Sequence, residues 1–219
     1  MNTKPTVIVL AEPPSEPARV PPDGDGVMAT FNALDTTLRR VLASGLPMLL
    51  VAPADQAAAA IDLVPSKDIL VVSSPPPLQP RADWLVGCMA AAVMTRPQAS
   101  GWLLLPADMP MLQVGTLRSL ADILPSQGPI VFPCHRHRRG HPVAFSAELY
   151  SELVRLGSEQ DLRRLAARYP SVDLEIDDPG IHLALEARAG LSQLRAQLTG
   201  ASVHLGAAPA RRPTPHSHN

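Results

Sequence analysis

An apolar run at residues 101–105, Gly-Trp-Leu-Leu-Leu, most constrains the fold of this chain. It is short, contains no charged residue and is bounded by turn formers, which is typical of a strand buried on both faces of a parallel sheet. Pro106 ends the run and Asp108 follows it. Open α/β sheets bind ligands at the carboxyl ends of their strands. By position alone, Asp108 is either a ligand-binding carboxylate or the cap of the next turn.

Similar apolar runs alternate with helical patterns along the first 125 residues. The expected strands cover residues 6–11, 47–52, 68–72 and 101–105, and the expected helices cover residues 28–42, 54–63, 84–94 and 114–123. This alternation predicts a parallel, doubly wound α/β sheet.

The pattern changes in the last third of the chain. Strands are expected at 129–132, 142–145 and 172–176, helices at 147–156 and 158–168, and an apolar segment at 181–185 before a final helix to about residue 198. Ser158 is the expected N-cap of its helix, with Asp161 three residues on. We expect one domain over residues 1–198 and a disordered tail over residues 199–219.

Composition excludes several classes of protein. A net charge of -1 over 219 residues gives no reason to expect nucleic acid or a membrane surface as partner. Cys88 and Cys134 lie far apart without metal-type spacing, which favours a reduced, cytoplasmic protein. No apolar segment is long enough for a signal peptide or a membrane span.

Four segments carry a resemblance to a known family, in the family's order. They are Val7-Ile-Val-Leu-Ala11, Pro106-Ala-Asp-Met-Pro110, Arg138-Arg-Gly-His-Pro-Val143 and Asp177-Asp-Pro-Gly-Ile181. This set resembles the MobA-like nucleotidyltransferases, in particular the branch that attaches cytidylate or guanylate to molybdopterin. The likeness covers roughly residues 5–198, and the Arg-Arg-Gly-His-Pro run is its most specific part.

The resemblance implies a fold, a reaction and a set of site residues. The implied fold is a three-layer, mostly parallel, doubly wound (Rossmann-like) sheet of the nucleotide-diphospho-sugar transferase type. The implied reaction moves CMP or GMP from CTP or GTP to a molybdopterin-like acceptor with Mg²⁺, and a molybdoenzyme or its chaperone is the implied protein partner. The implied site comprises Asp108 and Glu186 for the metal, Asp108 and Arg19 for catalysis, Leu10, Ala11 and Arg19 for the nucleotide, and Arg138, Arg139, Gly140, His141 and Pro142 for the acceptor.

This chemistry is consistent with the residue types. Phosphoryl transfer needs positioning and neutralisation of charge more than covalent help. Mg²⁺ keeps several waters and phosphate oxygens, so the single carboxylate of Asp108 can be a sufficient protein ligand. Arg138 and Arg139 can bind phosphate oxygens as forks, or they are a solvated basic turn. Glu186 either shares the metal or is a solvated charge at a helix start.

The first loop departs from the family pattern. Where the family has a glycine-rich loop that wraps the triphosphate with backbone amides, this chain reads Leu10-Ala-Glu-Pro-Pro-Ser-Glu-Pro-Ala-Arg19. Pro13, Pro14 and Pro17 have no N–H to donate, and Glu12 and Glu16 add negative charge. We therefore expect this loop to bind a triphosphate poorly.

Three hypotheses follow from the sequence. The first is an active nucleotidyltransferase that uses Asp108 and Mg²⁺ with an altered loop. The second is a catalytically impaired relative that binds or regulates in the same pathway. The third, an unrelated dinucleotide-binding protein, has least support because no Gly-x-Gly-x-x-Gly follows the first strand.

Overall fold

The computed structural model describes residues 4–13 and 25–184. In this part of the chain, all strands join one eight-stranded sheet in the order β3-β2-β1-β4-β7-β5-β6, with β8 paired to β5. The strands are β1 (Thr6–Leu10), β2 (Met48–Ala52), β3 (Ile69–Val71), β4 (Gly101–Pro106), β5 (Ile130–His135), β6 (Arg138–Arg139), β7 (Val143–Ser146) and β8 (Ser171–Glu175). The predicted α/β class and mostly parallel sheet are confirmed.

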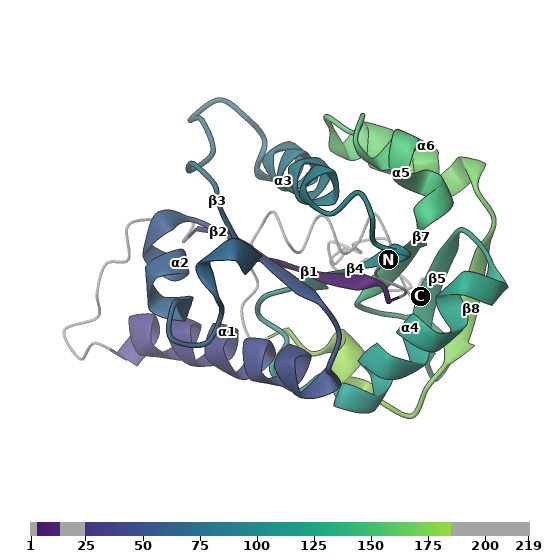
Figure 1. The fold of residues 1–219 in the computed structure, drawn as a ribbon, viewed down its shortest axis with the longest axis horizontal. Helices are drawn as coiled ribbons and strands as arrows, with labels where there is room; N and C mark the ends of the chain where they lie inside the picture. The colour runs from purple at the N-terminus through teal and green to yellow at the C-terminus, as the bar shows by residue number, and fades with distance from the viewer. Residues whose placement is uncertain (1–3, 14–24, 185–219) are drawn as a thin grey trace, which may run out of the picture.

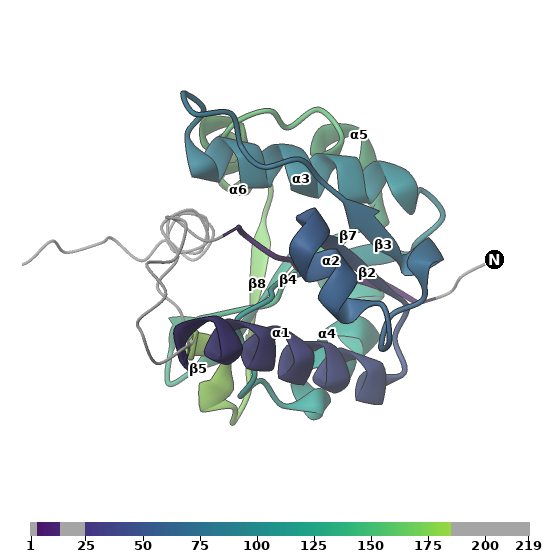
Figure 2. The same cartoon turned by 90° about the vertical axis from the view of Figure 1, so that its left-hand side faces the viewer.

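Helices cover both faces of this sheet and make three layers (Figures 1 and 2). The α-helices are α1 (Asp25–Ser44), α2 (Ala54–Ala60), α3 (Arg81–Thr95), α4 (Val114–Gln127), α5 (Tyr150–Leu153) and α6 (Glu159–Arg168). Three short 3₁₀ helices are η1 (Ser66–Asp68), η2 (Ala147–Leu149) and η3 (Pro179–His182). Helices α1, α2 and α4 pack on one face, and α3, α5 and α6 pack on the other. No helix among the described residues is long and apolar enough to cross a bilayer.

The central strands are apolar without interruption because both of their faces are buried. In β1, Val7 and Val9 pack against α1 and α4, whereas Ile8 and Leu10 pack against α3. Trp102 and Leu104 of β4 join the α3 side in the same alternation. The expected caps are also present: Gly45, with φ of +70°, ends α1, and the hydroxyl of Ser158 accepts the Asp161 N–H at the start of α6.

The strand directions bring the ends of most strands to one edge of the sheet. Strands β1 to β4 are parallel, and β5 and β8 run the same way because β7 is antiparallel to both β4 and β5. The carboxyl ends of β1, β4, β5 and β8 and the amino end of β7 therefore share this edge, which we call the carboxyl edge. Every predicted site residue within the described ranges belongs to these ends or to the loops directly after them.

A few elements differ from their predicted form. The expected helix at residues 147–156 is the 3₁₀ turn η2 followed by the single turn α5. The basic turn contains a two-residue strand, β6. The apolar segment expected at residues 181–185 begins inside the 3₁₀ helix η3. Residues 185–219, which include the predicted final helix and tail, lie outside the described residues.

Candidate nucleotide site at the carboxyl edge of the sheet

Asp108 lies two residues beyond the end of β4, beside the end of β1. Leu10 is in register with Pro106, and the Ala107 N–H donates to the Leu10 carbonyl over 2.9 Å. Asp108 is only 5 % exposed, which is unusual for an aspartate. Leu10 and Ala11 have buried side chains, and the Ala11 N–H donates to Val51, so their described contacts are those of the sheet.

Side chains of α2 and α3 form hydrogen bonds and an ion pair with the start of the first loop. The Glu12 side chain is 0 % exposed and forms a 3.2 Å ion pair with Arg81, the first residue of α3. Arg81 also donates to the Pro13 carbonyl over 3.0 Å, and the Gln56 side chain in α2 donates to the Glu12 carbonyl over 3.0 Å. The Glu12 charge that we expected to repel a triphosphate is therefore paired with a guanidinium inside the fold. Arg19 lies outside the described residues.

The Arg-Arg-Gly-His-Pro segment divides into an exposed and a buried part. Arg138 is exposed. Arg139 points to the sheet, where its guanidinium pairs with Asp173 over 2.7 Å, donates to Ser171 and lies 4.4 Å from the centre of the Phe132 ring. Arg139 is thus held by internal partners, and Arg138 is the guanidinium that faces solvent.

The second half of this segment packs against η3. The His141 N–H donates to the Ile181 carbonyl over 3.0 Å, and the His141–Pro142 peptide bond is cis. A Cβ on Gly140 would lie 2.6 Å from the Ile181 carbonyl oxygen, so only glycine fits there. His141 is itself buried, with only 2 % of its surface exposed.

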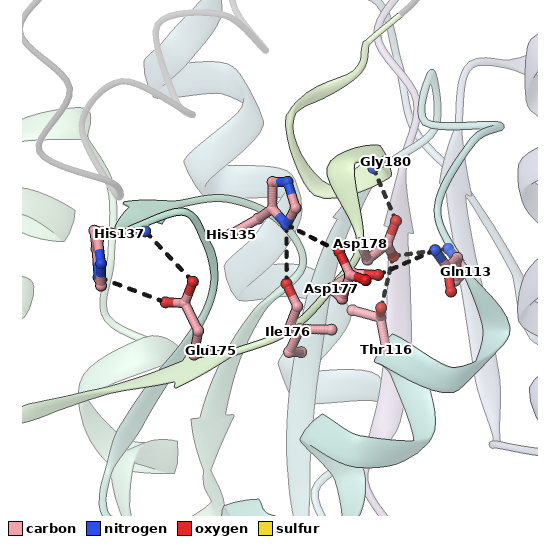
Figure 3. A network of polar contacts seen from close by, with 9 residues as sticks. All are labelled: Gln113, Thr116, His135, His137, Glu175, Ile176, Asp177, Asp178 and Gly180. Atoms are coloured by element: carbon pink, nitrogen blue, oxygen red, sulfur yellow. Dashed lines mark hydrogen bonds and ion pairs between the residues drawn. The ribbon is translucent and has the colours of Figure 1, made fainter.

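Two histidines that the sequence analysis did not select also lie at the carboxyl edge. His135 is within 3.1 Å of the Ile176 carbonyl and 3.8 Å from the Asp177 carboxylate (Figure 3). The ring of His182 lies 6.3 Å from that of His135. Burial lowers the pKa of His182, and the charge of Arg138 adds to this shift.

Asp178 is the centre of a polar network that sequence reasoning missed. One carboxylate oxygen accepts hydrogen bonds from the Gln113 N–H and the Thr116 hydroxyl, and the other accepts from the Gly180 N–H (Figure 3). Gln113 and Thr116 belong to the start of α4, shortly after Asp108 in the chain. The only sequence signal was the Asp-Pro-Gly turn, which marks a cap but not its distant partners.

The described residues provide few ligands for a metal. No group of three or more His, Cys, Asp or Glu side chains within residues 4–13 and 25–184 could hold an ion by itself. Asp108 alone is consistent with Mg²⁺, which binds through one or two carboxylates together with waters and substrate phosphates. The predicted second ligand, Glu186, lies outside the described residues.

Neither cysteine provides a nucleophile. Both are buried free thiols. Burial raises the pKa of Cys88 to about 12 and, with the nearby Asp173 and Glu175 charges, that of Cys134 to about 11. Because the thiolate is the reactive form, both groups are unreactive at neutral pH.

Comparison with known proteins identifies the family of this arrangement. Among solved structures, Rv0371c of Mycobacterium tuberculosis in complex with manganese has a TM-score of 0.62 and 24 % identity, with 89 % of this chain and 99 % of that chain covered. A nucleotidyl transferase of Methanothermobacter thermautotrophicus has a TM-score of 0.55 and 15 % identity, covering 89 % and 97 %. CMP:2-keto-3-deoxy-manno-octonic acid synthetase complexed with CTP has a TM-score of 0.56 and 14 % identity, covering 80 % and 90 %.

At these identities, the solved structures establish a common fold with nucleotide-diphospho-sugar transferases. Comparison with curated proteins gave no match. The sequence profile of the MobA-like NTP transferase domain, by contrast, matches residues 27–173, which is about two thirds of the chain. The chain therefore belongs to the MobA-like NTP transferase domain family.

Proposed function

We propose that this protein transfers a nucleoside monophosphate from CTP or GTP to the phosphate of a molybdopterin-like acceptor, with Mg²⁺ bound at Asp108. The observation that carries the proposal is the position of Asp108, a buried carboxylate just past β4 and beside the end of β1. Family membership supports the reaction class, and the resemblance of the Arg-Arg-Gly-His-Pro segment to the molybdopterin branch supports the acceptor.

Asp108, Arg138 and Arg139 would have separate roles in such a transfer. When bound, Mg²⁺ would supply neutralisation of the charge on the phosphate oxygens. Asp108 would hold the ion, since a carboxylate is a hard oxygen ligand. Arg138, which is exposed at the same edge, would bind an acceptor phosphate as a bidentate fork. Arg139 would act indirectly, because its ion pair with Asp173 orients the hairpin that carries Arg138.

A second candidate function is binding without transfer. It is favoured by Pro13, whose ring removes a backbone donor and whose carbonyl is fastened to Arg81. An amide cradle for a triphosphate cannot form at that residue. Under this hypothesis the protein retains the acceptor side of the site and regulates or carries the acceptor in the same pathway.

One experiment separates the two functions. Calorimetric titration of CTP, GTP and ATP with Mg²⁺ measures nucleotide binding, and release of pyrophosphate in the presence of molybdopterin measures transfer. Nucleotide-dependent pyrophosphate release establishes the transferase. Binding of molybdopterin without any pyrophosphate release supports the second function instead.

The metal assignment is tested by Asp108→Ala. We expect it to abolish Mg²⁺-dependent nucleotide binding, because no group of three or more His, Cys, Asp or Glu among the described residues could hold the ion instead. The matched control is Asp122→Asn, since Asp122 is exposed and shares a surface hollow with Lys4 at the opposite edge of the sheet. Equal nucleotide affinity in the Asp108→Ala variant and the parent would refute the assignment.

A further inference from the structure

Asp178 is buried where two segments distant in sequence meet. It is 1 % exposed, whereas its neighbour Asp177 is fully exposed. Its Oδ2 accepts from the Gln113 N–H over 2.9 Å and from the Thr116 hydroxyl over 2.6 Å, and its Oδ1 accepts from the Gly180 N–H over 2.8 Å. Three neutral donors thus bind one carboxylate (Figure 3).

Through these bonds Asp178 caps two helices at once. The first turn of a helix leaves backbone N–H groups without partners, and a capping side chain usually comes from the residue before the helix. At α4 that residue is Gln113, whose side chain makes no capping bond. The cap comes instead from Asp178, which also caps its own 3₁₀ helix, η3. The start of α4 is therefore fixed by the segment that follows β8.

A steric contact reinforces this connection. A Cβ built on Gly180 would overlap the carbonyl group of Met111, so η3 lies directly on the backbone of the loop between β4 and α4. Met109 and Leu112, in the same loop, have no exposed surface. Asp108 thus lies on a short loop that β4 holds at one end and Asp178 with Gly180 holds at the other.

We infer that Asp178 is a positioning residue, which sets the orientation of the Asp108 carboxylate toward a divalent cation. The inference rests on the proposed metal assignment of Asp108. Asp178 itself does not contact the ion, because both of its oxygens are occupied by α4 and η3. Partners that orient a metal ligand typically change metal affinity by about 10- to 100-fold when they are removed.

The test uses Mn²⁺ as the probe ion, because its binding is measured directly by electron paramagnetic resonance without any turnover. We expect Asp178→Asn to weaken Mn²⁺ binding by about 10-fold or more, since an amide cannot accept at both positions. Thr116→Val, which removes one donor, should have a smaller effect in the same direction. Faster hydrogen exchange at the amides of residues 109 and 111–113 should accompany both changes.

The control is Asp161→Asn, the same chemical change at the start of α6. Asp161 accepts bonds from Ser158 and Gly157 there, and α6 packs on the opposite face of the sheet from α4. If Asp178 were only structural, both Asp→Asn variants would lower the melting temperature and neither would change the dissociation constant for Mn²⁺. Wild-type Mn²⁺ affinity in a folded Asp178→Asn variant would therefore overturn the inference.

Failure of the proposed function gives a different pattern. If the parent protein does not bind Mn²⁺, or binds it equally with Asp108→Ala, the metal assignment of Asp108 is wrong. Hydrogen exchange then tests separately whether Asp178 holds the loop that carries Asp108. Faster exchange of residues 109 and 111–113 in Asp178→Asn but not in Asp161→Asn supports the coupling, and unchanged exchange overturns it.

Discussion

At the scale of single residues, the Glu12–Arg81 pair determines how the first loop begins. The Glu12 carboxylate is fully buried and the Arg81 side chain is 27 % exposed, so removal of Arg81 leaves a buried charge without this partner. We expect Arg81→Ala to lower the free energy of unfolding by about 3 kcal/mol, at the lower end of the range for buried pairs because Arg81 is partly solvated. Urea denaturation measures the loss, and Arg81→Ala with Glu12→Gln should recover most of it. A double variant as unstable as the single one would contradict this account.

His182 should make stability dependent on pH. Burial lowers its pKa in the folded protein below the ordinary 6.5, and Arg138 and His135 lower it further, while Asp178 and the His135 backbone oppose the shift. The unfolded chain therefore takes up a proton that the folded chain resists. Stability from the neutral ring is present above about pH 6.5 and declines as the pH falls below it. Replacement of His182 by Gln should flatten the dependence of the unfolding free energy between about pH 7 and 5. His137→Gln is the control because that ring is 98 % exposed.

At the scale of elements, the contact between the Arg-Arg-Gly-His-Pro segment and η3 allows no added volume. Gly140→Ala would place a methyl group 2.6 Å from the Ile181 carbonyl oxygen, which also accepts the His141 N–H. We expect a loss of about 1–3 kcal/mol, the usual cost of overpacking, measured by thermal denaturation. Gly87→Ala is the matched control, since α3 leaves open space there and alanine favours a helix. Equal effects of the two substitutions would show that the η3 contact is not tight.

Helices and strands with a local sequence signal could be predicted, whereas contacts between distant residues could not. Strands β1 and β4 were predictable because burial on both faces requires an unbroken apolar run, and the stop of α1 was predictable because Gly45 adopts a positive φ. The same pattern allowed Asp108 to be placed just after the carboxyl end of β4. The partners of Asp178 and Glu12 could not be found, because 62 and 69 residues separate them from Thr116 and Arg81, and only the folded sheet brings them together.

At the scale of the whole molecule, the sheet edge and the first loop have different implications for function. The parallel strands bring Asp108, Arg138 and the Asp178 network to one edge of the sheet. The loop after β1 begins with Glu12 and Pro13 fastened to α2 and α3, and Pro13 donates no amide. Under the proposed function, Asp108 would hold the metal and Arg138 would bind the acceptor. Nucleotide affinity is the property that the changed loop should weaken.

The two substrates should therefore change the stability of the folded protein differently. A ligand that binds only the folded state stabilises it by RT ln(1 + [L]/Kd), about 2.7 kcal/mol at 100 times Kd. We expect molybdopterin to raise the melting temperature of both the parent and the Asp108→Ala variant, because its phosphate is proposed to bind Arg138. CTP or GTP with Mg²⁺ should raise it only in the parent, and by less than in a relative with an intact glycine-rich loop. Nucleotide stabilisation equal to that of such a relative would show that residues 10–19 do not limit binding. Loss of the molybdopterin response in Asp108→Ala would show that the two substrates do not bind independently.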